Sequence, residues 1–182
     1  MKKISLIAIL FSGVLFLENC KKDTVVATAT STSLMIANIR DSSWYTDTVT
    51  ASLKYDAVNK TKTFTCVGSA NNKKISISLI TASSSNTSGF PLGTYNVDAT
   101  PNLQFALLTP QKAPSGNIEY LPVGTVYPGS GSIIISAVDS VKNQITGTFS
   151  FTTRINNPDN SVTITQVSIG GINKLPYTFS SN

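Results

Sequence analysis

The chain is 182 residues long and carries 14 lysine and arginine side chains, 9 aspartate and glutamate side chains and no histidine. The positive side chains are scattered with acids between them, so no basic stripe exists to neutralise consecutive phosphates, and nucleic acid is excluded as a partner. The missing histidine excludes Ser-His-Asp and Cys-His nucleophile systems, HExxH zinc sites and histidine-bearing iron sites.

The first 19 residues have the pattern of a secretory signal peptide. Lys2 and Lys3 provide a positive start, and residues 4–17 form an uncharged apolar run. Such a run has the length of a signal-peptide core but is too short to span a bilayer. We therefore expect residues 1–19 to be removed during export and not to form a transmembrane helix.

The end of this segment, Leu17 to Cys20, resembles the lipobox of bacterial lipoproteins. The resemblance implies that Cys20 receives lipid through its sulfur, becomes the mature N-terminus and is acylated there, with palmitate as a typical chain. Several acyl chains on one residue give stable attachment, so the protein is expected at the outer membrane of the cell envelope. The alternative is ordinary secretion after cleavage near Ser12 or Gly13, which would leave Cys20 free.

The remainder divides into a tether and one domain. Residues 20–33 begin with the lipidated cysteine and continue as a small, polar, flexible tether that can reach about 40 Å when fully extended. Residues 34–182 have a comfortable size for a single domain with its own core. If Cys20 carries lipid, Cys66 has no partner for a disulfide, so the domain depends on its core for stability.

The domain alternates apolar and polar residues with a period of two, which predicts β-strands. The segments share β-branched and aromatic residues bounded by Gly, Pro, Asn, Asp and Ser, and they are 49–55, 62–68, 74–81, 103–109, 132–138, 145–153 and 161–169. We therefore predict an all-β fold, an antiparallel β-sandwich of immunoglobulin-like or jelly-roll-like type, with a closed lipocalin-like barrel as the alternative. Residues 137–145 are expected to form a hairpin turn and not a helix.

Two parts of this pattern look alike. Both run from an Ile-x-Ile strand through a polar turn into Gly-Thr-aromatic-x-apolar, which places Gly93 and Tyr95 in the positions of Gly147 and Phe149. The similarity predicts two hairpins of one design. The alternative is convergence, with each glycine relieving crowding or lying at a bulge.

Carboxylates offer little catalytic chemistry. Glu119 is the one glutamate after residue 19, and most aspartates lie in expected turns, where their side chains bond their own backbone. Glu119 with Asp98 is the pair to inspect for a glycosidase. Asn157, Asp159 and Ser161 have the alternate spacing of a calcium loop but lack its later glutamate, so turn chemistry is the better interpretation. We predict no enzyme activity, no cofactor and no metal.

Binding is the better-supported kind of activity. Residues 110–132 are rich in Pro and Gly and carry Tyr120, Leu121 and Tyr127, which predicts a long loop presenting tyrosine faces to a sugar or peptide. The alternative is that Tyr120 lies in an edge strand that Pro122 ends.

Phe90 is the other candidate binding residue. It lies in the apolar tip 89–93 and either contacts a ligand or folds back over the open end of a sandwich. Trp44 and Tyr45 are adjacent, so in a strand they face opposite ways, and Trp44 is predicted to be in the core. Cys66 is expected to be a small buried hydrophobe without reactivity.

The two-fold pattern, the lone Trp44 and the lipobox together resemble uncharacterised β-sandwich lipoproteins of Gram-negative envelopes. The resemblance implies location and fold and carries no catalytic residue. The leading hypothesis is a non-enzymatic, membrane-anchored lipoprotein whose sandwich binds a protein or glycan or serves as an accessory structural subunit. A lipocalin-like carrier of small apolar ligands is the second hypothesis, and a glycan hydrolase is the third.

Overall fold

The computed structural model of the chain describes residues 33–182. The predicted signal peptide, Cys20 and all of the tether except its last residue lie outside the described residues, so these features remain predictions. Within the described range, no helix is long and apolar enough to cross a membrane.

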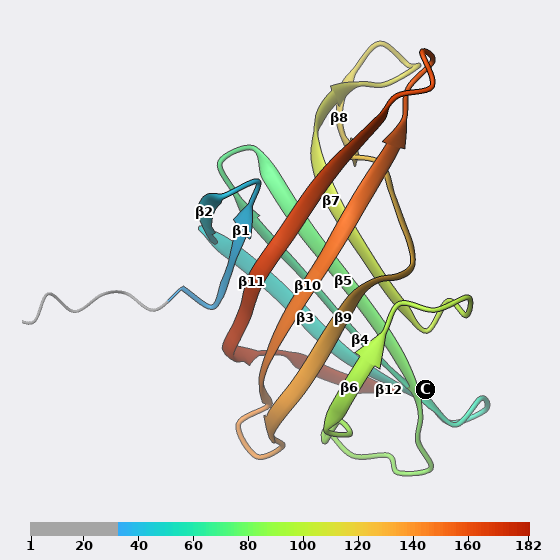
Figure 1. Cartoon of the computed structure of the whole chain (residues 1–182). Helices are drawn as coiled ribbons and strands as arrows, with labels where there is room; N and C mark the ends of the chain where they lie inside the picture. Colours follow the sequence, from blue (N-terminus) through green and yellow to red (C-terminus); the bar gives the residue numbers. More distant parts are fainter. Residues whose placement is uncertain (1–32) are drawn as a thin grey trace, which may run out of the picture. The chain divides into compact units, whose positions relative to one another are not determined.

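The domain contains two six-stranded sheets, called sheet A and sheet B (Figure 1). Sheet A has the order β2-β1-β11-β10-β9-β6, and all its pairings are antiparallel. Its strands are β1 (Met35–Ile39), β2 (Ser42–Tyr45), β6 (Gly93–Asn96), β9 (Thr125–Asp139), β10 (Gln144–Asn156) and β11 (Val162–Pro176).

Sheet B has the order β12-β3-β4-β5-β7-β8. Its strands are β3 (Thr48–Asp56), β4 (Thr61–Ala70), β5 (Lys73–Ala82), β7 (Leu103–Lys112), β8 (Ile118–Pro122) and β12 (Thr178–Ser181). The chain leaves the end of β11 in sheet A and crosses to the edge of sheet B, where β12 runs parallel to β3 (Figure 1). Every other pairing in sheet B is antiparallel.

The two sheets pack face to face as a sandwich, and their strands run across one another (Figure 1). Each sheet keeps two edge strands, β2 and β6 in sheet A and β12 and β8 in sheet B. The sandwich prediction is therefore confirmed, and the alternative of a closed lipocalin-like barrel is wrong, because a closed barrel has no edges. The carrier hypothesis placed its ligand inside that barrel, and the sandwich has no such interior in the described part of the chain.

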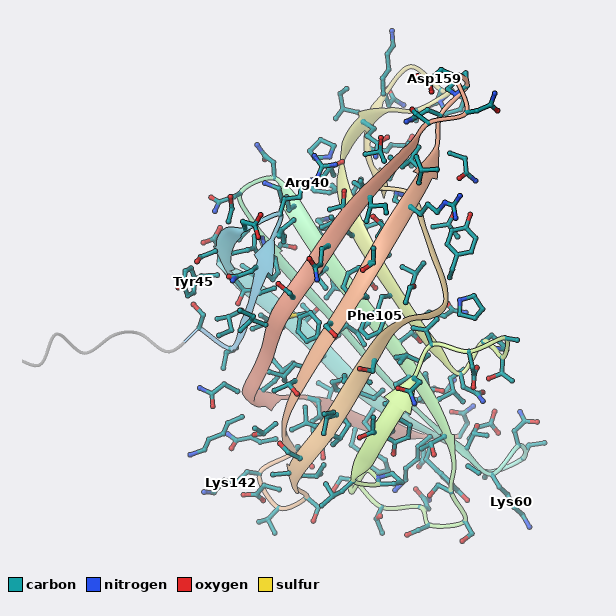
Figure 2. The ribbon with its side chains drawn as sticks, viewed as in Figure 1. Arg40, Tyr45, Lys60, Phe105, Lys142 and Asp159 are labelled. Carbon is teal, nitrogen blue, oxygen red and sulfur yellow. The ribbon has the colours of Figure 1, made fainter. Side chains whose placement is uncertain are left out.

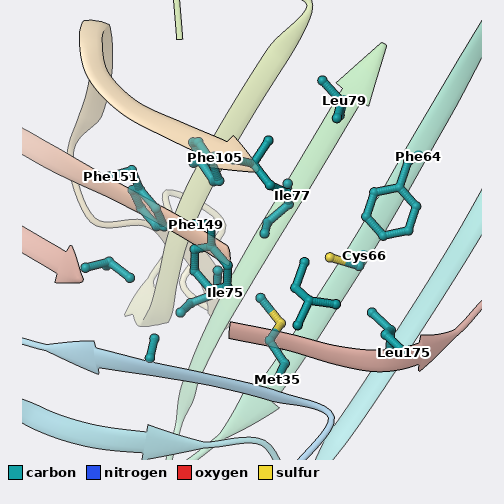
Figure 3. Packing of buried hydrophobic residues seen from close by; sticks show 14 of the residues in the cluster. Met35, Phe64, Cys66, Ile75, Ile77, Leu79, Phe105, Phe149, Phe151 and Leu175 are labelled. Atoms are coloured by element: carbon teal, nitrogen blue, oxygen red, sulfur yellow. The ribbon is translucent and has the colours of Figure 1, made fainter. Parts of the chain in front are cut away.

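The core lies between the sheets and is filled by side chains from alternate strand positions. Phe105 of β7 stacks on Phe151 of β10, with ring centroids 4.7 Å apart and planes 7° apart, and Phe149 lies beside both rings (Figure 3). Figure 2 places Phe105 in the middle of the sandwich and Tyr45 at its surface. Burial of each ring stabilises the fold by about 1.5–3 kcal/mol, which compensates for the missing disulfide.

The predicted alternation is borne out in strand after strand. In β4, Phe64 and Cys66 are buried while Thr63 and Thr65 face outward. Hydroxyl groups on the outer face can bond to water, so β4 has a mainly apolar inner side and a mainly polar outer side.

The hairpin predicted for residues 137–145 is confirmed, since β9 and β10 pair across it. The Asp139 carboxylate accepts hydrogen bonds from the backbone N–H groups of Val141 and Lys142, at 3.0 and 2.9 Å. Asn143 completes the turn with a φ of 51°, a conformation that asparagine tolerates better than most residues.

The prediction of two hairpins of one design is wrong. Strands β9 and β10 form such a hairpin within sheet A, whereas the chain between β5 and β6 passes from sheet B to sheet A. The two glycine motifs nevertheless flank one strand, because Gly93 and Gly147 both pair with Ile135 of β9. The two similar sequence motifs therefore belong to the strands β6 and β10, which lie on either side of β9.

Three single-residue predictions are confirmed. Trp44 is 2% exposed and donates a hydrogen bond from Nε1 to the carbonyl oxygen of Ala70 at 3.1 Å, while Tyr45 is 57% exposed. Cys66 is buried in the core of sheet B. The side chains of Trp44 and Cys66 therefore serve packing.

Candidate functional site

Residues 110–132 do not form the predicted long loop. They contain the end of β7, all of β8 and the first half of β9. The alternative is confirmed, because β8 is an edge strand of sheet B and Pro122 is its last residue. Leu121, in the same strand, is half-buried.

Tyr120 and Tyr127 are not brought together. The Lys74 ammonium lies 3.8 Å from the ring centroid of Tyr120, and Lys74 alternates with buried Ile75 on the outer face of sheet B. Tyr127 has the guanidinium of Arg154 at 5.8 Å, and Arg154 lies on the outer face of sheet A. The two tyrosines therefore belong to opposite faces of the sandwich and cannot share one small ligand.

Phe90 is not presented to a ligand. It is 5% exposed and packs between the rings of Phe64 and Tyr95, with centroids 6.2 and 6.1 Å away. The expectation of an exposed binding tip is corrected here, because the loop folds back and this ring closes one end of the core.

Glu119 and Asp98 do not form a glycosidase pair. Glu119 pairs with Gln111 at one end of β7, while Asp98 lines a hollow with Leu103 at the other end. Leu103 and Gln111 are about 26 Å apart at a strand rise of about 3.3 Å per residue. Glycosidases need their two carboxyl groups within roughly 10 Å.

Asp98 and Asp159 take part in turns. The hydroxyl and N–H groups of Thr100 donate to the Asp98 carboxylate and hold its pKa below the usual range. Ser161 does the same for Asp159, and the Asn157 amide bonds the Ser161 hydroxyl at 2.9 Å. These aspartate side chains therefore stabilise turns by accepting local hydrogen bonds. No cluster of potential metal ligands occurs in residues 33–182.

The best candidate site is a trough on the outer face of sheet A, which sequence reasoning missed. Its first part is a hollow of about 420 Å³. The side chains of Ile36, Ile134 and Ile169 stand around it, and Thr148 and Gly171 line its floor. This part of the trough is mainly apolar.

A β-bulge in β11 creates one wall of this hollow. Phe149 pairs with Gly170 and Phe151 with Val167, so two residues of β11, Ser168 and Ile169, face one residue of β10. Ile169 has a φ of 50° and is 74% exposed. A β-branched residue rarely adopts this conformation, so the fold holds Ile169 outward at a cost in free energy.

Two glycines keep the floor open. A Cβ atom on Gly170 would lie 2.4 Å from the carbonyl oxygen of Phe149. A Cβ atom on Gly171 would lie 3.1 Å from Cγ1 of Ile36, inside the hollow. The absence of side chains here therefore serves both strand packing and the shape of the surface.

The second part of the trough is polar. A hollow of about 330 Å³ adjoins the first and shares Ser132 and Ser150 with it. The side chains of Asn96, Ser130, Thr152 and Gln166 complete its polar lining, and Gly129 and Gly131 also line it. Hydroxyl and amide groups both donate and accept hydrogen bonds. We call the two hollows together the outer trough.

The outer trough is electrically neutral. Among the residues that line its two hollows within the described chain, none is charged. A ligand carrying a carboxylate, phosphate or ammonium group would find no ionic partner here. The geometry suits a neutral molecule with both polar and apolar faces.

A further hollow of about 560 Å³ lies between β3, β4 and the junction of β11 with β12. It is lined by Ala51, Cys66, Pro176 and Tyr177 together with Ser and Thr residues, and it shares none of them with the trough. Its volume alone does not define a site, because no amide side chain lines it and the hydroxyl groups of Ser52 and Thr65 bond each other at 2.8 Å.

One signal for the trough was present in the sequence. Consecutive glycines, Gly170 and Gly171, interrupt an otherwise regular strand pattern, and glycine inside a strand often marks a bulge or a close approach. The partners that complete the trough come from β1, β6, β9 and β10, and strand order cannot be derived from alternation.

Comparison with known proteins places the chain in a family. Residues 31–176 match DUF6252, described as a domain of unknown function, and the chain belongs to this family. No curated protein and no solved structure matches the chain.

Proposed function

We propose that this protein is a lipid-anchored lipoprotein of the outer membrane whose sandwich binds a glycan in the outer trough without catalysing a reaction. The anchor is supported by the sequence pattern that ends at Cys20. The observation that carries the binding function is the neutral trough, with hydroxyl and amide groups at one end and three isoleucines at the other.

Sugars match this lining chemically. Their hydroxyl groups would exchange hydrogen bonds with Asn96, Ser132 and Gln166, and their C–H faces would pack on Ile134 and Ile169. A neutral ligand also agrees with the lack of charged lining residues in the described chain. Because the floor consists of small residues on strands of one sheet, little ordering is needed when a ligand binds.

A protein partner is the second candidate. It is favoured by the exposure of Ile134 and Ile169, which are 43% and 74% exposed. Against it, protein interfaces commonly rely on exposed aromatic and arginine side chains, and the exposed residues lining the described trough include neither.

The test uses the chain from residue 20 onward with Cys20→Ser, applied to an array of neutral and charged glycans. Ser132→Tyr fills the trough, and Ser76→Tyr is the matched control, since Ser76 is a half-buried outer-face residue of β5 in sheet B. We expect the protein without a trough substitution and the Ser76→Tyr control to bind the same neutral glycans. The Ser132→Tyr variant should bind them with at least about tenfold lower affinity.

Thermal unfolding of both variants shows whether they are folded. Binding that survives Ser132→Tyr would contradict the trough as the site, and binding to no glycan would contradict the proposed ligand class. Capture of an envelope protein that Ser132→Tyr abolishes and Ser76→Tyr preserves would favour the second candidate.

A further inference from the structure

A second groove continues the outer trough around the edge of sheet A. It has a volume of about 540 Å³ and lies between the end of β5 and the edge strand β6. Thr81 lines it from β5, Thr94 and Tyr95 from β6, and Asn102 from the segment before β7. We call it the edge groove.

The edge groove and the outer trough share a lining residue. Asn96, the last residue of β6, lines both the edge groove and the polar hollow of the trough. Ser132 and Ser150 in turn join that hollow to the apolar one. Three hollows therefore adjoin one another through shared lining residues, and we call them together the track. A fourth hollow of about 350 Å³ adjoins the edge groove through Asp98 and Leu103.

The track is much longer than a single sugar site. The trough crosses β1, β11, β10, β9 and β6, which are neighbours in this order. Four strand spacings of about 4.8 Å give about 19 Å, and the edge groove adds to this length. An extended polymer fits such a path better than a compact molecule does.

The edge groove repeats the hydroxyl and amide lining of the trough's polar hollow. The edge groove adds the hydroxyl groups of Thr81 and Thr94, the amide of Asn102 and the ring of Tyr95. Tyr95 is half-buried, and its hydroxyl donates to the carbonyl oxygen of Pro91 at 2.9 Å, so its ring is held in place. Aromatic rings held in this way offer an apolar face at low entropy cost.

Charge is almost absent from the track. Asp98 is the one charged residue among the described residues that line the outer trough and the edge groove, and Thr100 already bonds its carboxylate. Without a lysine or arginine, the track cannot pair with uronate, sulfate or phosphate groups. An acidic polymer would be repelled at Asp98.

We propose that the track binds a linear, uncharged polysaccharide along its length, recognising several consecutive sugars within the chain and not a chain end. This inference rests on the proposed glycan-binding function and specifies its ligand. The lining residues of the trough lie on the outer face of sheet A, so a bound polymer can extend past its apolar end.

The test measures affinity for oligosaccharides that increase in length from disaccharide to octasaccharide. The probes are fragments of cellulose, laminarin, mannan and amylose, with alginate fragments as an acidic comparison. For the neutral series that binds, we expect affinity to rise at least about tenfold with length and then to level off when the track is full. Affinity should change less than about twofold between low and physiological salt.

A variant at the junction distinguishes binding along the whole track from binding in one hollow alone. Asn96→Trp places a bulky ring between the edge groove and the trough and is expected to abolish the gain with length. Ser78→Trp, on the outer face of sheet B, is the control that should keep the gain. Unfolding curves establish that both variants are folded.

The possible failures are distinguishable. Equal affinity for disaccharide and octasaccharide would overturn the track and leave glycan binding in the trough intact. Tighter binding of alginate fragments than of neutral ones would overturn the charge argument. Binding to none of these series would overturn both the track and the proposed function.

Discussion

Gly170 lies directly against Phe149, so that a single added carbon would stand 2.4 Å from the phenylalanine carbonyl oxygen and 2.6 Å from its ring. The contact links the core to the trough, because Phe149 is buried in the core and both residues also line the apolar hollow of the trough. Stability and surface shape therefore depend on the same residue.

Gly170→Ala is expected to destabilise the domain by about 1–3 kcal/mol, since either the β10–β11 ladder or the Phe149 ring must move. Urea unfolding followed by fluorescence measures the loss. Gly89→Ala is the control, because the nearest atom to its Cβ would be 3.7 Å away, an ordinary contact. Equal stability of the Gly170→Ala variant and the wild type would contradict the packing described here.

Ile169→Gly should make the domain more stable and weaken binding. Ile169 has a φ of 50°, and the left-handed conformation costs a non-glycine residue about 1–2 kcal/mol, which glycine does not lose. The side chain is 74% exposed, so little burial is lost. The same variant removes a wall of the trough, so affinity for the glycan should fall while the unfolding free energy rises.

Ile164→Gly is the matched control on the same strand, since Ile164 is 61% exposed and has no positive φ. Glycine weakens an ordinary strand position, so this control should lose stability. A loss of stability in Ile169→Gly as large as in the control would show that Ile169 is not strained.

Lys62 makes stability depend on pH in the alkaline range. It is 2% exposed, and its ammonium group donates to the Thr87 hydroxyl and the Gly89 carbonyl oxygen. Burial lowers the pKa of Lys62 below the ordinary lysine value of 10.5. Between the two values the unfolded chain binds more protons than the native protein, so native stability rises with pH.

Lys62→Met removes this titration. We expect the unfolding free energy of the wild type, relative to this variant, to increase as the pH rises toward the ordinary lysine pKa of 10.5. Lys54→Met, at an exposed position of β3, is the control for removing a lysine charge from the surface. If the difference in unfolding free energy between the wild type and Lys62→Met does not change with pH, burial does not destabilise the charged form of Lys62.

Cys66 is expected to resist thiol reagents in the folded domain. It is 1% exposed, and burial raises the pKa of its thiol to about 12, so the reactive thiolate is scarce at neutral pH. In the Cys20→Ser protein, labelling should occur only in denaturant. Ser76→Cys provides a half-buried thiol on the outer face of the same sheet that should react faster than Cys66, and rapid labelling of native Cys66 would contradict its burial.

Cys20→Ser tests the anchor. In cells that make the protein, the wild type should be recovered from the outer membrane with fatty acid on Cys20, and the variant should be recovered without it. Cys66→Ser is the control and should keep the lipid, because Cys66 lies within the core. Mass spectrometry that finds wild-type Cys20 without lipid would remove the anchor from the proposed function.

Alternation in the sequence was sufficient to predict the seven longest strands, the sandwich and the inward residues Trp44 and Cys66, but not the short strands β1, β2, β6 and β12. Each of the features predicted correctly depends on the side of one strand to which a side chain points, and a period of two determines this locally. The hairpin after Asp139 was predictable for the same reason, since its hydrogen bonds join neighbouring residues.

The candidate site depended on information that alternation does not contain. Tyr120 and Tyr127 are close in sequence, but a change of sheet between β8 and β9 puts them on opposite faces. The trough needs the order of five strands and a bulge at Ile169, which shifts the register of β11. Both result from the packing of the whole domain.

Amide hydrogen exchange with and without the neutral glycan that binds most tightly tests the central claim most directly. The account predicts slower exchange in residues 129–134, 148–152 and 166–171, which include the residues that line the trough, and unchanged exchange in β3. If amide exchange slows only in β8, around Tyr120, and is unchanged in the trough, the central claim is contradicted.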